Sequence, residues 1–113
     1  MKCKKFDIWL ADLSPRFGAE PGKTRPVIIL QTDLLPNTHP TVIILPVTSQ
    51  VHKKVTILRV HLDQNINGLQ LPSDILIDQV RSIDKKRLLR KLGALTEDQI
   101  KKVLKNTKIL VLE

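Results

Sequence analysis

Short apolar runs rich in β-branched residues dominate the first part of the chain. Two of these runs, Pro26–Gln31 and Thr41–Val47, are almost wholly apolar. Both are too short and too β-branched for helices, and their composition is typical of central strands buried on both faces. Phe6–Leu13 carries Asp7 and Asp12 around an apolar run, which predicts a first strand.

The middle of the chain predicts further extended segments. Val55–His61 predicts a fourth strand, and Asn65–Gly68 predicts a turn. Leu69–Ile83 alternates polar and apolar residues over part of its length, so it predicts either a strand pair or one bent strand, with Pro72 at an edge or bulge. Arg90–Leu95 predicts a last short strand.

Helix signals appear only near the end. Asp84 predicts the cap of a short helical turn, 84–89. Thr96 and Gln99 form a capping box that opens a helix, with an apolar face of Ile100, Val103 and Leu104 and with no clear end before Leu112. Several strands followed by a helix, without βαβ alternation, predict a single domain over residues 1–113, mainly β (α+β) and a small barrel.

A loop rich in glycine and proline, Ser14–Arg25, connects the first two predicted strands. Its turn residues would form a loop without any charged group. It nevertheless carries one carboxylate, three cations and an aromatic ring, namely Glu20, Arg16, Lys23, Arg25 and Phe17. We interpret it as a polar site on a rigid frame.

The charge balance suggests a polyanionic partner. The 113 residues include 19 Lys and Arg against 11 Asp and Glu, a formal charge of +8, and the isoelectric point is near 9.9. Such an excess in a small chain favours nucleic acid. A merely soluble basic surface is the alternative, and a membrane surface is disfavoured because the basic residues do not line one amphipathic helix.

The sequence predicts no metal site, no intrachain disulfide and no membrane span. Cys3 is the only cysteine, and the histidines at 39, 52 and 61 lack metal-ligand spacing. No apolar run approaches a membrane span, and the basic N-terminus is not followed by a signal-peptide core. We therefore expect a cytoplasmic protein without metal or cofactor.

The junction of the loop with the second strand supplies the best candidate chemistry. Arg25 presents paired donors that match phosphate oxygens, although it would equally serve in a surface ion pair with Glu20. The hydroxyls of Thr48 and Ser49 follow a buried strand and would either face a ligand or cap the turn. Phe17 would stack on a base or pack in the core. The basic residues of 85–91 predict a solvated face with a secondary role in attracting phosphate.

Motifs spread over nearly the whole chain resemble one known family. They are Asp7-Ile8-Trp9, Asp12-Leu13-Ser14-Pro15, Gly18-Ala19-Glu20, Lys23-Thr24-Arg25-Pro26-Val27, Pro46-Val47-Thr48-Ser49 and Ile77-Asp78-Gln79-Val80-Arg81-Ser82-Ile83-Asp84. In this order they resemble the MazF/PemK family of toxin endoribonucleases of type II toxin–antitoxin systems. The resemblance implies an SH3-like β-barrel with a C-terminal helix, a homodimer that cuts single-stranded RNA, and a cognate antitoxin that blocks the RNA groove. The apolar run Val42–Val47 adds to the expectation of a dimer, because a small monomer would struggle to cover it.

The resemblance also implies site residues. Arg25 and Thr48 fall on the positions tied to cleavage, and Glu20 is the chemically easier proton acceptor, although the base is left open. The expected RNA contacts are Phe17, Gly18, Lys23, Ser49, Gln50, His52, Lys53, Gln79 and Arg81. Two positions depart from the family pattern: Phe6 replaces the usual Gly, and Asp78 replaces a frequent Glu.

The implied reaction uses the 2′-hydroxyl of RNA as nucleophile and leaves 2′,3′-cyclic phosphate and 5′-hydroxyl ends. It requires no metal, and DNA would bind without being cut. Two alternatives stay open from the sequence. One is a non-catalytic SH3-like module that binds nucleic acid or protein, and the other is an interaction protein whose only ligand is an antitoxin-like partner.

Overall fold

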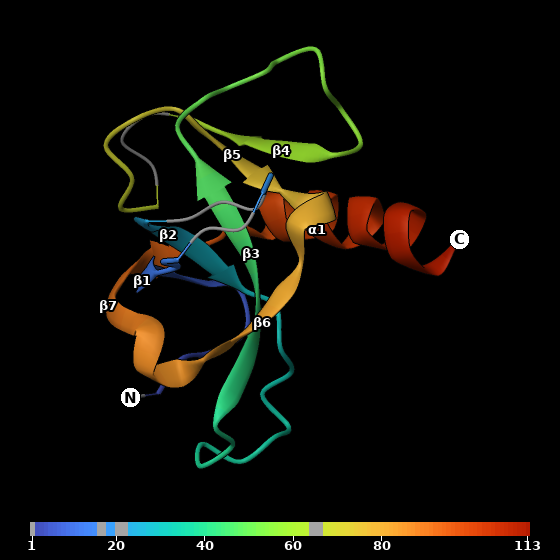
Figure 1. Ribbon diagram of the computed structural model, residues 1–113. Coiled ribbons are helices and arrows are strands. Elements are labelled where there is room, and N and C mark those ends of the chain that lie inside the picture. Colours follow the sequence, from blue (N-terminus) through green and yellow to red (C-terminus); the bar gives the residue numbers. More distant parts are fainter. Residues whose placement is uncertain (1, 16–17, 20–22, 64–66) are drawn as a thin grey trace.

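The structure, a computed structural model, describes residues 2–15, 18–19, 23–63 and 67–113 (Figure 1). Seven antiparallel strands form one sheet. They are β1 (Asp7–Asp12), β2 (Thr24–Ile29), β3 (Thr41–Thr48), β4 (Arg59–Leu62), β5 (Ser73–Leu76), β6 (Arg81–Asp84) and β7 (Leu88–Ala94). The helical elements are η1 (Ile77–Gln79), η2 (Lys85–Arg87), α1 (Glu97–Thr107) and the π-helical η3 (Lys108–Leu112). The predicted mainly β domain with a C-terminal helix is confirmed.

Strand β3 is the centre of the sheet. The strand order is β4-β5-β3-β2-β1-β7, and β6 pairs with β3 beside β5. One edge of β3 therefore pairs with β2, while its other edge pairs with β6 along its first half and with β5 at its end. The path ends on β4 and β7, and no ladder among the described residues joins these two strands, so the barrel is not closed by hydrogen bonds.

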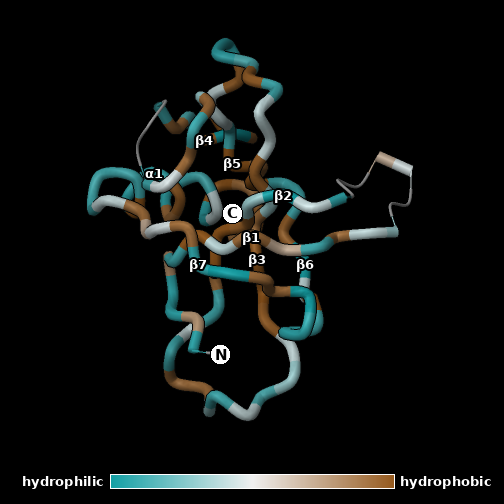
Figure 2. The backbone as a smooth tube through the Cα atoms, turned by 90° about the vertical axis from the view of Figure 1, so that its left-hand side faces the viewer, coloured by the Kyte–Doolittle hydropathy of each residue, from teal (hydrophilic) through white to brown (hydrophobic). Residues whose placement is uncertain are grey.

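The sheet is buried on both faces. Alternate residues of each strand point to opposite sides. Ile8 and Ile28 belong to one core cluster that includes Val103 of α1, whereas their neighbours Trp9 and Val27 belong to a second cluster with Leu88 of β7. Figure 2 shows the hydrophobic segments meeting where the strands converge, with hydrophilic segments in the loops around them. Burial on both sides explains the nearly continuous apolar strands.

The apolar run of β3 is covered within one chain. Val42, Ile44, Leu45 and Val47 are buried, and only Ile43, at 41% exposure, reaches the surface. The two core clusters lie on its two faces, and strands flank both edges. The run thus needs no partner chain to bury it, so the expectation of a dimer loses this particular support and keeps the support of the family.

Two predicted capping signals are confirmed. The backbone N–H of Lys86 donates to Asp84 at 2.8 Å, which caps η2. Thr96 and Gln99 form the reciprocal capping box at the start of α1, with distances of 2.8 and 3.3 Å. The helix passes into η3 after Thr107, an end that the sequence pattern did not resolve.

The predicted apolar face of α1 is wrong at Leu104. Val103 is fully buried and Ile100 packs against the core, but Leu104 is 45% exposed. Successive helical residues differ by about 100° around the axis. Val103 points directly at the sheet, and its neighbour therefore points partly into solvent.

The fourth strand is shorter than predicted, since β4 begins only at Arg59. Its partner β5 ends at Leu76, which pairs with Arg59, and the chain then turns into η1. Residues 55–58 consequently have no strand beside them. For the segment 69–83, the strand-pair alternative is correct, with the two strands on β3 instead of on each other.

Gly68 is a backbone position where a side chain does not fit. Its φ is +79°, and a Cβ atom there would overlap the carbonyl oxygen of Leu92. We expect Gly68→Ala to lower the free energy of unfolding by about 2–4 kcal/mol, from overpacking and left-handed strain together. Denaturant titration at constant pH measures this difference.

Gly18→Ala is the matched control. Gly18 also has a positive φ, +54°, but a Cβ atom added there would meet no described group within 4 Å beyond its own chain neighbours. Only the backbone strain of about 1 kcal/mol applies there. Equal losses in the two variants would contradict the proposed clash.

Candidate nucleic-acid interface

A groove of about 810 Å³ lies where the ends of β2 and β3 meet β4, β5 and the loops around them. Its described lining includes both polar and apolar residues. The lining residues are Leu10, Ala19, Lys23, Thr24, Arg25, Pro26, Val47, Thr48, Ser49, Gln50, Arg59, Gly68, Leu69, Gln70, Leu71, Ser73, Leu76, Arg90 and Leu92.

The register of β2 and β3 brings Arg25 and Thr48 together. Val27 pairs with Pro46 in this antiparallel ladder. The ladder ends at this pair, and beyond it Arg25 of β2 and Thr48 of β3 both line the groove. A guanidinium and a hydroxyl can therefore act on one group bound in the groove.

The hydroxyl of Thr48 has a defined orientation. It accepts a hydrogen bond from the backbone N–H of Gln50 at 3.2 Å. This is the turn-capping contact that the sequence offered as the alternative role of Thr48. It occupies an acceptor position of the oxygen and leaves the hydroxyl proton available for donation to a ligand.

The base of the β1–β2 loop is braced by backbone contacts. The N–H of Leu13 donates to the carbonyl of Lys23 at 2.8 Å. Arg87 Nη1 donates to the carbonyl of Asp12 at 3.0 Å and also to that of Ser14. Arg87 of η2 thus holds the start of the loop, and the ladder of β1 with β2 holds its end, which positions Arg25.

The described lining of the groove is positively charged. It includes four basic residues, Lys23, Arg25, Arg59 and Arg90, and among the described lining residues there is no Asp or Glu. Clefts lined by one sign of charge attract counter-charged ligands and raise their association rates. The groove therefore favours a polyanion.

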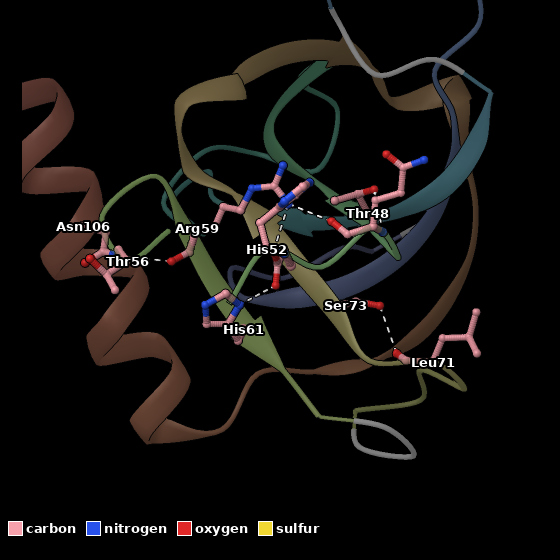
Figure 3. A network of polar contacts seen from close by, with 10 residues as sticks. Thr48, His52, Thr56, Arg59, His61, Leu71, Ser73 and Asn106 are labelled. Atoms are coloured by element: carbon pink, nitrogen blue, oxygen red, sulfur yellow. Dashed lines mark hydrogen bonds and ion pairs between the residues drawn. The ribbon is translucent and has the colours of Figure 1, made fainter. Parts of the chain in front are cut away.

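A buried carboxylate lies behind this lining. Asp74 of β5 is 0% exposed. It accepts from the backbone N–H of His52 and from Arg59 Nη1, both at 2.9 Å, and from Nδ1–H of His61 (Figure 3). Burial by itself raises the pKa of Asp74, but the hydrogen bonds from His52, Arg59 and His61 outweigh it and leave the pKa below its ordinary value of 3.8.

The structure places the predicted site residues in three groups. Lys23, Arg25, Thr48, Ser49 and Gln50 line the groove. Gly18, His52, Lys53, Gln79 and Arg81 are described but are not among its lining residues. Phe17 and Glu20 lie outside the described residues.

Sequence reasoning missed Arg59 and Gln70, which also line the groove. Arg59 sits inside an apolar run and resembles an ordinary outward residue of a strand. No spacing rule connects it with Arg25, because only the pairing of β4 with β5 and of β5 with β3 brings it to the groove.

The described part of the chain offers neither a metal centre nor a membrane-spanning helix. No three His, Cys, Asp or Glu side chains in it converge in a way that would hold a metal ion. None of its helices is long and apolar enough to cross a membrane.

Asp74 predicts a pH-dependent stability. Because its folded pKa is depressed, its contribution is present above its ordinary pKa of 3.8 and is lost as the pH falls through the folded value. We expect Asp74→Asn to lower the free energy of unfolding by about 3 kcal/mol at neutral pH, since buried donors lose their charged partner. The difference from the unmodified protein should shrink as the pH is lowered below 3.8.

Denaturant titrations across this pH range test the prediction. Asp63→Asn is the control, because Asp63 is an exposed carboxylate just after β4. It should change stability by less than about 0.5 kcal/mol. A loss in Asp74→Asn that is the same at acidic and neutral pH would contradict the assigned role of the charge.

Known proteins match this chain over nearly its whole length. A family model described as PemK-like, MazF-like toxin of type II toxin–antitoxin system matches residues 4–111. Endoribonuclease EndoA of Bacillus subtilis is 38% identical over 103 residues, 91% of this chain and 89% of that protein.

Solved structures share the fold. MazF from Deinococcus radiodurans superposes with a TM-score of 0.82 at 22% identity, over 98% of this chain and 97% of the other. An endoribonuclease from a mycobacterial species, in complex with its cognate antitoxin, gives a TM-score of 0.76 at 14% identity, over 96% of this chain and 93% of the other. The chain therefore belongs to the family of PemK-like, MazF-like toxins of type II toxin–antitoxin systems.

Proposed function

We propose that the groove binds single-stranded RNA and that Arg25 and Thr48 carry out its cleavage. The chain is a toxin endoribonuclease by family and by its relation to EndoA. The observation that supports this site is that Arg25 of β2 and Thr48 of β3, on two paired strands, line the same groove with its basic lining. We place its action on mRNA in the cytoplasm, where cleavage stops translation and growth.

The reaction is an attack by the 2′-hydroxyl of RNA on the adjacent phosphorus. The bond from phosphorus to the 5′-oxygen breaks, which leaves a 2′,3′-cyclic phosphate and a 5′-hydroxyl end. The nucleophile belongs to the substrate, so the protein must only move protons and stabilise charge. The 2′-hydroxyl loses one proton and the departing 5′-oxygen gains one, so the reaction needs no metal ion or added co-reactant.

Arg25 stabilises the charge that develops on the phosphorane oxygens. Its guanidinium remains protonated at any physiological pH and presents several donors in a fixed plane. The hydroxyl of Thr48 donates a hydrogen bond to a phosphate oxygen, while the oxygen of the same hydroxyl accepts one from the backbone N–H of Gln50. Donors already oriented toward developing charge supply the largest single contribution in many enzymes.

Glu20 is our candidate for the proton acceptor. It belongs to the same loop as Lys23 and Arg25, and a carboxylate accepts a proton more readily than a guanidinium does. Cations beside it would favour its ionised form. Glu20 lies outside the described residues, so the assignment rests on the chemistry of the loop sequence.

The remaining proposed RNA contacts surround this centre. Lys23, Ser49 and Gln50 contact the strand where they line the groove. The loop residues Phe17 and Gly18 contact it from the β1–β2 side. Four further residues are proposed to extend the surface for RNA, although they are not among the lining residues: His52, Lys53, Gln79 and Arg81.

We further propose a homodimer and a cognate antitoxin as partners. The mycobacterial neighbour in complex with its antitoxin motivates the second partner. Exposed apolar side chains that a monomer leaves uncovered, such as Ile43, Leu104 and Leu112, are available to such contacts. An antitoxin that covers the groove would exclude RNA from the basic lining.

Arg25→Ala should reduce the rate of RNA cleavage by about 100- to 1,000-fold, the usual cost of removing one donor to a developing oxyanion. Thr48→Ala should give a loss in the same direction. The measurement is incubation with a long single-stranded RNA in EDTA, followed by mapping of the fragment ends. Discrete 5′-hydroxyl ends that disappear in both variants are expected.

Lys101→Ala is the control, because Lys101 is an exposed cation of α1 and does not line the groove. It should cleave like the unmodified protein. Intact RNA with measurable binding would support the non-catalytic module instead. Failure to bind RNA even at low salt would support a protein whose only ligand is its antitoxin-like partner.

The dimer is tested by sedimentation at micromolar concentration. We expect twice the chain mass of 12.8 kDa. A species that sediments at the mass of a single chain across this range would overturn the dimer and leave the assignment of the groove intact.

A further inference from the structure

Resting on the proposed function, we infer that Arg59 is a further RNA-binding residue of the groove and that the buried carboxylate of Asp74 is a positioning residue that holds it there. The family motifs of the sequence contain neither residue. The two are linked by a contact between β4 and β5, and only one of them reaches the groove.

Arg59 has the geometry of a preorganised donor. Its Nη1 donates to the carbonyl of Gln50 at 2.7 Å and to Asp74 at 2.9 Å. These two bonds use both hydrogens of Nη1. Among the described residues no hydrogen bond is made by Nε or Nη2 of Arg59, while the side chain is 20% exposed and lines the groove. The remaining donors are therefore held in a defined plane for a ligand.

Asp74 itself cannot touch RNA, because it is fully buried. It instead connects three pieces of chain: β5, on which it lies, β4 through Arg59 and His61, and the loop after β3 through the N–H of His52. Figure 3 shows His52, Arg59 and His61 close together, with dashed lines marking their contacts. The carboxylate thus sets the position of Arg59 and of the loop that carries Ser49 and Gln50.

His61 shows that Asp74 does not merely neutralise a groove cation. It lies two residues after Arg59 on β4 and donates to the other oxygen of Asp74, but it is not among the residues that line the groove. One carboxylate therefore holds one side chain inside the site and one outside it. Replacing Arg59 should therefore change both RNA binding and stability, whereas replacing His61 should change stability alone.

Phosphate is the group that Arg59 is suited to bind. The described lining of the groove holds further cations and no carboxylate, so an anionic backbone meets no repulsion there. A guanidinium fork matches two phosphate oxygens at once. Arg59 comes from β4 and Arg25 from β2, strands that β5 and β3 separate in the sheet, so we assign to Arg59 a phosphate next to the one on which Arg25 acts.

The first test measures binding of a mixed-sequence 2′-O-methyl RNA oligonucleotide, which has no free 2′-hydroxyl to attack phosphorus. Binding is measured at several salt concentrations for the unmodified protein, Arg59→Ala and the control Lys101→Ala. One phosphate contact on a single strand contributes about 0.7 to the slope of log K against log salt. We expect Arg59→Ala to reduce the slope by about that amount and to weaken binding about 10- to 100-fold.

The second test uses the cleavage reaction on unmodified RNA. Arg59→Ala should raise KM by a similar factor with little change in kcat, since the residue binds substrate away from the reacting phosphate. Asp74→Asn should also raise KM, because Arg59 loses its anchor. His61→Gln should leave KM unchanged even if it lowers the melting temperature.

The outcomes separate the two proposals. If the unmodified protein binds RNA in a salt-dependent way but does not cut it, the proposed reaction is wrong and the role of Arg59 in binding still holds. An Arg59→Ala protein with unchanged affinity and salt slope would overturn the role of Arg59. Equal rises in KM for Asp74→Asn and His61→Gln would show that Asp74 acts only through general stability.

Discussion

The whole structure depends on β3, which needs a hydrogen-bonded strand at each edge and packed side chains on each face. One edge pairs with β2, and the other edge is divided between β6 and β5. Both faces carry core side chains, so a slip of one residue would exchange the two apolar sets and is strongly disfavoured. Thr48 is the last residue of this strand. The pairing that buries the core therefore also brings Thr48 to the groove that Arg25 of β2 lines.

The site is assembled at the cost of bringing like charges together. Its cations come from separate elements: Lys23 precedes β2, Arg25 lies in β2, Arg59 in β4 and Arg90 in β7. Such an array repels itself until a polyanion binds, and neutralisation by phosphate then releases condensed counterions. Asp74 offsets part of this repulsion from beneath the surface, where it pairs with Arg59 and is not exposed to the ligand.

Local signals in the sequence correctly predicted the features that depend only on neighbouring residues. The Thr96–Gln99 capping box and the Asp84 cap need only neighbouring residues, and both are present. The central strands also followed from their composition. Predictions failed where a distant partner decides: β4 is short because β5 ends at Leu76, and Leu104 is exposed because only one narrow stripe of α1 faces the sheet.

The sequence by itself determined a basic, mainly β domain, the loop that precedes Arg25, and the family to which the chain belongs, because composition, periodicity and motif order are properties of the chain alone. The tertiary structure decided which side chains share the groove. Arg59 and Arg25 lie far apart in the sequence, and they line the same groove only because the strands pair in the order β4, β5, β3 and β2. The burial of Asp74 likewise could not be predicted from the sequence, since a carboxylate is buried only where folding supplies it with enough hydrogen-bond donors.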